Sequence, residues 1–141
     1  MSLKDMIFDK TPIPTLAKGL DAFSRRQRSI AHNLANIETP GYQRRYVRFE
    51  EELKSVLDSK NAALKVTSEG HLPFTNGLFD KLEGTIFTDQ ETPPINGVNN
   101  VSLDQEMADL ATNNLHYQTS ARLIRLYFDG LRNAIRGGGA S

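Results

Sequence analysis

Histidine, serine and carboxylate side chains are the residues of this sequence that could support acid–base, nucleophilic or metal chemistry, because the chain contains no cysteine. The three histidines stand at positions 32, 71 and 116 and do not have the spacing of a metal-ligating motif such as His-Glu-x-x-His. Ser29 and His32 are one helical turn apart, yet no oxyanion-binding group accompanies them. The sequence therefore predicts no catalytic residue, no cofactor, no metal ion and no small-molecule substrate.

A different chemistry is suggested by aromatic and basic residues that alternate after residue 41, namely Tyr42, Arg44, Arg45, Tyr46, Arg48 and Phe49. Such a segment could stack bases and bind phosphates, as proteins that bind single-stranded nucleic acid do. The whole chain opposes this interpretation, since 17 basic and 17 acidic residues leave no net charge. No nucleic-acid partner is expected, and only a steeply salt-dependent affinity would revive that alternative.

The charges are nevertheless separated along the chain. Residues 25–48 contain six arginines and one glutamate, whereas residues 69–106 contain seven carboxylates and one lysine. Two interpretations stay open, because each patch is either a solvated face or one half of a contact between subunits.

The chain has 141 residues, which is enough for about one domain. Its apolar fraction of 38% is low for a globular domain, so a large core is hard to build. Residues 1–10 carry both signs of charge and lack the continuous apolar run of a secretory signal. No run of about 18 apolar residues occurs either, so neither a cleaved signal nor a membrane span is predicted.

The first long helix is predicted from seven positions at alternating steps of four and three, six of them apolar, namely Leu16, Leu20, Phe23, Gln27, Ile30, Leu34 and Ile37. Thr11 is expected to cap this helix, with Pro12 and Pro14 in its first turn. The helix should end near Glu38, because Pro40 disfavours helical backbone in the residue before it.

The second long helix follows the same alternation over ten positions, nine of them apolar, namely Leu103, Met107, Leu110, Asn114, Tyr117, Ala121, Ile124, Phe128, Leu131 and Ile135. Ser102 and Gln105 form a capping-box pattern at its start, and three glycines from Gly137 terminate it. A helix over residues 103–136 would be about 50 Å long. Such a rod is too long for a compact domain of this size.

The fold class expected from these patterns is mainly α, with long N- and C-terminal heptad helices that pair as an antiparallel coiled-coil layer. The chain divides into an N-terminal axial helix with its exit and a short helix (1–57), an irregular or extended middle segment containing little β structure (58–98), and a C-terminal axial helix with a glycine-rich tail (99–141). Short elements are expected as an extended stretch at 42–49, a helix at 49–57 and strands at 64–67 and 85–88.

Two long helices have only one seam between them, so the pair should be marginal alone and completed by neighbours. Leu115, Leu123 and Leu126 lie off the predicted seam, where they could contact such neighbours. The alternative is that the middle segment folds over these leucines. Gln27 and Asn114 are the only polar seam positions, and they could face one another to fix the register.

The end of the first helix carries the motif Asn33-Leu34-Ala35-Asn36-x-x-Thr39-Pro40-Gly41-Tyr42. It resembles the signature of the bacterial flagellar rod, hook and hook-filament junction proteins. Further similarity, at Gln43 to Glu51 and in Met107-Ala108-Asp109-Leu110-Ala111 with Asn114 and Tyr117, is to the proximal rod proteins of this family. Chemically, the asparagines can bond backbone at a helix end, proline stops the helix, and glycine and tyrosine form its exit.

The resemblance implies a structural axial subunit of the flagellar basal body rod, in the periplasmic space, which serves as part of the drive shaft for motility. It implies export through the flagellar type III apparatus without a cleaved signal peptide, and self-association by helical stacking of the terminal helices. Expected partners are other rod proteins, the membrane-ring junction and the FliE adaptor. The alternatives are a non-polymerising coiled-coil adaptor of a secretion system and, less favoured, a nucleic-acid-binding protein.

Overall fold

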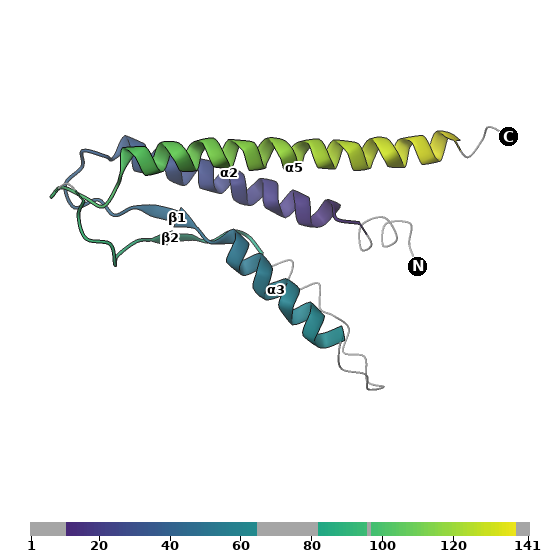
Figure 1. Ribbon diagram of the computed structural model, residues 1–141, viewed down its shortest axis with the longest axis horizontal. Helices are drawn as coiled ribbons and strands as arrows, with labels where there is room; N and C mark the ends of the chain where they lie inside the picture. Colours follow the sequence, from purple (N-terminus) through teal and green to yellow (C-terminus); the bar gives the residue numbers. More distant parts are fainter. Residues whose placement is uncertain (1–10, 65–81, 96, 138–141) are drawn as a thin grey trace.

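The computed structural model describes residues 11–64, 82–95 and 97–137 (Figure 1). The elements of these residues are α2 (Ile13–Ala35), β1 (Arg45–Val47), α3 (Phe49–Leu64), β2 (Ile86–Thr88) and α5 (Leu103–Gly137). Figure 1 shows α2 and α5 side by side, with the two-stranded sheet of β1 and β2 near one end of the pair and α3 diverging from it. We call this strand pair the hairpin, although the connection between its strands includes α3. The prediction of a mainly α fold with long N- and C-terminal helices is confirmed.

The two long helices run antiparallel. Contacts between them pair Asn33 with Glu106, Gln27 with Asn113 and Phe23 with His116, so residue numbers fall along α2 as they rise along α5. None of the helices among the described residues is both long enough and apolar enough to cross a membrane.

The helix α2 begins and ends differently from the sequence prediction. Pro12 occupies the N-cap and no side chain caps the helix, so the prediction that Thr11 caps it is wrong. The helix stops at Ala35 rather than near Glu38, because the next turn tightens through bonds from Asn36 N to Asn33 O and from Ile37 N to Leu34 O.

The face that α5 turns toward α2 is polar at its first half. Glu106 and Asn113 are the buried residues of this helix among those described. Five predicted seam residues are exposed instead, namely Leu103, Met107, Tyr117, Phe128 and Ile135. The predicted seam is therefore wrong for these five within a single chain.

The remaining seam residues lie closer to the helix interface. Leu110, Ala121, Ile124 and Leu131 of α5 are half-buried, as are Leu16, Leu20, Phe23, Gln27, Leu34 and Ile37 in the first part of the chain, and Ile30 is buried. The heptad count treats every apolar position as facing the partner helix, so it does not show which of these positions the partner helix covers.

The hairpin packs against α2 through a small core of Ala22, Val47, Phe49 and Leu82. The strands β1 and β2 are antiparallel, with Tyr46 opposite Phe87. This confirms the extended stretch predicted at 42–49 and the strand predicted at 85–88. The helix predicted at 49–57 is present and continues to Leu64, so Leu64 is not in a strand; residues 65–67 lie outside the described residues.

One glycine is required for this packing. Gly84 has a φ of +67°, and a Cβ added there would lie 3.0 Å from the Cβ of Ala22 and 3.2 Å from Cγ1 of Val47. A larger residue would therefore suffer both backbone strain and a steric clash.

Candidate functional site

The signature asparagine Asn33 is the centre of a polar cluster where α2 ends. Its side chain is fully buried. Its Nδ2 donates to the backbone oxygen of Arg45 at 2.8 Å and to Oε2 of Glu106 at 3.0 Å, while its Oδ1 accepts from the hydroxyl of Tyr42 at 3.0 Å and from the backbone N–H of Arg45 at 2.9 Å. One amide therefore joins α2, the strand β1 and α5.

The other signature residues shape the exit from the helix. Asn36 donates to the backbone oxygen of His32 at 2.8 Å and accepts from the hydroxyl of Thr39 at 3.2 Å. Gly41 adopts a φ of +71°, and its N–H donates to the backbone oxygen of Val98 at 2.9 Å. Leu34 is half-buried, whereas Ala35 and Pro40 are exposed.

A second asparagine, Asn99, holds this exit from the other side of the chain. Its buried Nδ2 lies 3.2, 2.7 and 3.2 Å from the backbone oxygens of Asn36, Ile37 and Thr39, and its Oδ1 accepts from the N–H of Val101 at 3.0 Å. These contacts tie the turn that follows α2, residues 36–39, to the segment that precedes α5. The sequence prediction missed Asn99, because its partners lie about sixty positions earlier in the chain.

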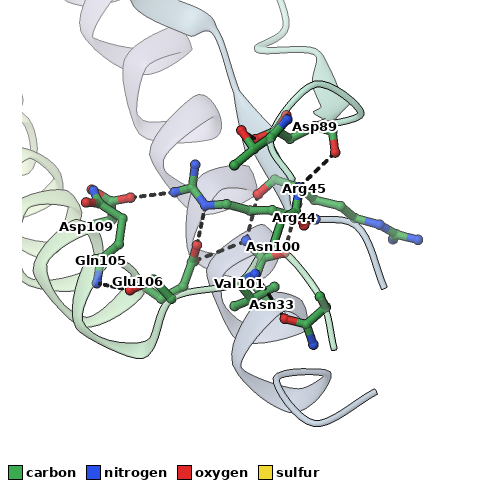
Figure 2. A network of polar contacts seen from close by, with 12 residues as sticks. Asn33, Arg44, Arg45, Asp89, Asn100, Val101, Gln105, Glu106 and Asp109 are labelled. Atoms are coloured by element: carbon green, nitrogen blue, oxygen red, sulfur yellow. Dashed lines mark hydrogen bonds and ion pairs between the residues drawn. The ribbon is translucent and has the colours of Figure 1, made fainter. Parts of the chain in front are cut away.

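An ion-pair network completes the cluster (Figure 2). Nε of Arg44 donates to Oε1 of Glu106 at 2.5 Å, and its NH2 group donates to Oδ2 of Asp109 at 2.7 Å. Its backbone N–H donates to Oδ1 of Asn100 at 2.7 Å, and Asp109 accepts a further bond from Gln105 at 2.9 Å. A buried carboxylate such as Glu106 is tolerated only with charged and hydrogen-bonding partners of this kind.

We call this cluster the polar joint, and it consists of Asn33, Tyr42, Arg44, Asn99, Asn100, Glu106 and Asp109. Burial raises the pKa of the Tyr42 hydroxyl, with Arg45 lowering it and Glu106 raising it further. Tyr42 therefore keeps the proton that it donates to Asn33. The polar side chains of the joint bind one another and the backbone, so they fix the register between α2 and α5.

A smaller polar contact lies further along the helix pair. Asn113 donates to the backbone oxygen of Phe23 and to Oε1 of Gln27, both at 3.0 Å. The prediction that Asn114 would face Gln27 is wrong by one residue, since Asn114 is exposed.

The outer side of α5 carries apolar residues. Leu115, Leu123 and Leu126 are exposed there, with Leu115 and Leu126 about two-thirds exposed. Leu123 and Leu126 also line an open groove of about 480 Å³ between α5 and Thr11, which precedes α2. The prediction that these leucines lie on the outside stays a prediction as regards their contacts.

No group of three or more potential metal ligands occurs among the described residues. Ser29 and His32 lie on α2 without forming a nucleophile–base pair there, since the hydroxyl oxygen of Ser29 is buried with no hydrogen-bond partner.

Comparison with known proteins identifies the chain. A family model described as flagella basal body rod protein matches residues 13–43, which include α2 and the signature. The flagellar basal body rod protein FlgB of Salmonella typhimurium is 31% identical over 126 residues, covering 86% of this chain and 90% of that protein. The chain belongs to the FlgB family of flagellar basal body rod proteins.

Relatives of the same name occur in distant bacteria. FlgB of Escherichia coli is 32% identical with the same coverage, and FlgB of Bacillus subtilis is 30% identical over 89% of this chain and 94% of its own length. The resemblance found from the signature is thereby confirmed. As a member of the FlgB family the chain is a structural subunit of the flagellar basal body rod, and it acts together with other flagellar components.

Proposed function

We propose that this rod subunit is incorporated into the proximal rod by helical stacking, in which exposed apolar residues of α5 pack against copies of the chain and related rod proteins. The observation that carries the proposal is the large exposed apolar surface of α5. Isolated soluble domains rarely leave contiguous apolar surface uncovered.

Two flanks of α5 carry this surface. One flank contains Leu103, Met107, Tyr117, Phe128 and Ile135, and the other contains Leu115, Leu123 and Leu126. At about 100° per residue the first set lies within about 100° of buried Glu106, on the side of α5 that faces α2, whereas Leu115 and Leu126 lie roughly opposite Glu106 on the outer side. Neighbours on both sides would turn the helix pair into part of a continuous layer, and the residues predicted as a seam would then serve between subunits.

Partners beyond the rod follow from the family resemblance. We include the FliE adaptor, the membrane-ring junction and the type III export apparatus, through which the chain would pass without a cleaved signal. We assign no catalytic step, since the buried carboxylate of Glu106 and the guanidinium of Arg44 are bound to each other. The three-part organisation at 1–57, 58–98 and 99–141 belongs to the same proposal.

The test is complementation of a strain that lacks its own copy of this gene. The chain should restore motility and rod assembly, whereas the double variant Met107→Glu and Phe128→Glu should not, because carboxylates on the apolar flank prevent packing. A matched control, Gln118→Glu with Arg122→Glu, places carboxylates at exposed polar positions of the same helix and should retain function.

If the unmodified chain, the double variant and the control all restored motility equally, the proposed role of Met107 and Phe128 in packing between subunits would be contradicted. Failure of the unmodified chain, with basal bodies still arrested before rod formation, would contradict the proposed role itself. Sedimentation with purified rod proteins distinguishes a polymerising subunit from a non-polymerising adaptor.

A further inference from the structure

A shallow basic cleft lies between α2 and the hairpin. It has a volume of about 420 Å³ and is lined by Arg25, Arg28, Ser29, His32, Arg45 and Ile86. Residues 25, 28 and 32 share one face of α2 because they are three and four positions apart. Arg45 comes from β1 and Ile86 from β2, so three elements bring the basic side chains together.

Most of these basic side chains have no partner within the described part of the chain. There the side chains of Arg28, His32 and Arg45 make no hydrogen bond or ion pair, and Arg25 has only a long contact to Glu83 at 3.6 Å. Figure 2 shows Arg45 extending away from the polar joint, while Arg44 points into it. Like charges at this spacing repel, so the cleft would be stabilised by an anionic group.

The opposite face of the hairpin carries negative charge. A cleft of about 470 Å³ there is lined by four carboxylates, Glu50, Glu51, Asp89 and Glu91, and by two arginines, Arg44 and Arg48. Glu50 is paired with Arg26, and Glu51 has only a long contact of 3.8 Å to Arg48, so the cleft keeps a net negative charge. The pKa of Asp89 is held below its usual value mainly by the hydroxyl of Thr92, which keeps the carboxylate ionised. In addition, residues 82–121 contain no lysine or arginine.

Strand alternation places the two clefts on opposite faces. Tyr46 and Phe87 stack with ring centroids 6.0 Å apart on the acidic side. Arg45 and Ile86 point the other way, toward the basic cleft, because neighbouring residues of a strand face opposite sides. A chain with complementary surfaces on opposite faces can bind its own copies head to tail, which gives an open stack rather than a closed dimer.

We propose that the basic cleft of one copy binds the carboxylates on the acidic face of a second copy, with Arg28 and Arg45 facing Glu51 and Glu91. This contact rests on the proposed function, since it specifies how neighbouring subunits in the rod are oriented. Charge complementarity supports a second copy as the occupant, because the acidic partner surface belongs to the same chain.

The experiment measures self-association of the purified full chain by analytical ultracentrifugation at low and high salt. Variant R28E/R45E reverses the basic side, E51K/E91K reverses the acidic side, and a third variant combines all four changes. All four residues are exposed. Each single-side variant should lower the association constant at least about tenfold, since like charges then face each other.

The reversed charges should complement each other again when combined. The fourfold variant should regain association, and an equimolar mixture of the two single-side variants should form mixed contacts between R28E/R45E on one chain and E51K/E91K on the other. High salt should lower the association constants of the unmodified chain and of the fourfold variant alike. The matched control R122E/R125E makes the same change of net charge on exposed residues of α5 and should associate like the unmodified chain.

Circular dichroism must show equal helix content for every variant. If R28E/R45E loses helix content, R28Q/R45Q replaces it. This variant removes the two positive charges without adding negative ones, so it should also lower the association constant, by a smaller factor. The inference is overturned if the unmodified chain does not associate, if the control loses as much affinity as R28E/R45E, or if the fourfold variant stays monomeric. Motility of the complemented strain separates the two claims: restored motility together with unchanged association of R28E/R45E sinks only this inference.

Discussion

The two ends of the helix pair are stabilised by different means. At the polar joint, buried side chains such as Asn33 and Glu106 bind one another and the backbone of distant segments. At the other end, α5 presents apolar residues such as Leu126 and Ile135 to the surroundings. The difference is one of chemistry: hydrogen bonds that need fixed geometry hold one end of the chain together, and at the other end apolar surface stays exposed.

The largest loss of stability is expected when Glu106 of the polar joint is replaced. Glu106→Ala should lower the free energy of unfolding by about 3 kcal/mol, because Arg44 and Asn33 lose a buried partner. Urea unfolding followed by circular dichroism measures this loss. Asp104→Ala removes an exposed carboxylate from the same helix and should cost about 0.5 kcal/mol. Similar losses for both variants would show that the joint does not carry the stability assigned to it.

A second test uses two glycines with the same backbone conformation. Gly84→Ala should cost about 2–3 kcal/mol, because it combines the positive φ with a contact of 3.0 Å to Ala22, whereas Gly41→Ala should cost only about 1 kcal/mol, since nothing lies within 4 Å of its Cβ. Thermal unfolding of the two variants gives the comparison. If Gly41→Ala proves the more damaging change, packing between the hairpin and α2 is not what makes Gly84 necessary.

A smaller effect is expected from Asp89 as the pH changes. The hydroxyl of Thr92 and backbone N–H groups lower the pKa of Asp89, so this carboxylate stabilises the folded chain above the unfolded pKa of about 3.9. The contribution is lost as the pH falls through the lower folded value. Unfolding free energies of the unmodified chain and Thr92→Val, measured between about pH 6 and about pH 3, should differ least at the acidic end. A constant difference would exclude the carboxylate as its source.

The smallest effect on stability is expected in the apolar half of α5. Ile135→Ser should change the unfolding free energy by less than about 0.5 kcal/mol, because the residue is 80% exposed. The same variant should weaken self-association in sedimentation experiments. A large loss of stability in the monomer would mean that this end of α5 is covered within its own chain, and it would remove the contrast between the two ends.

Sequence patterns predicted the helices, their antiparallel pairing and the hairpin strands, because periodicity and helix-stop signals are local. They also indicated that Asn33 and Tyr42 belong to one motif, although not that Asn33 binds Glu106 on the far helix. The exposure of Met107 was mispredicted, since a heptad pattern marks apolar positions without showing which of them the partner helix covers. Asn99 escaped notice because an asparagine in a loop has no periodicity to reveal its partners.

The placement of the polar joint at one end of the helix pair also determines the position of the other end. The 35 residues of α5 span about 50 Å, so a difference of about 5° in its angle to α2 at the joint corresponds to about 4 Å at its far tip. The bonds of the joint and the contact of Asn113 with Gln27 therefore determine the position of side chains that lie tens of ångströms away along α5.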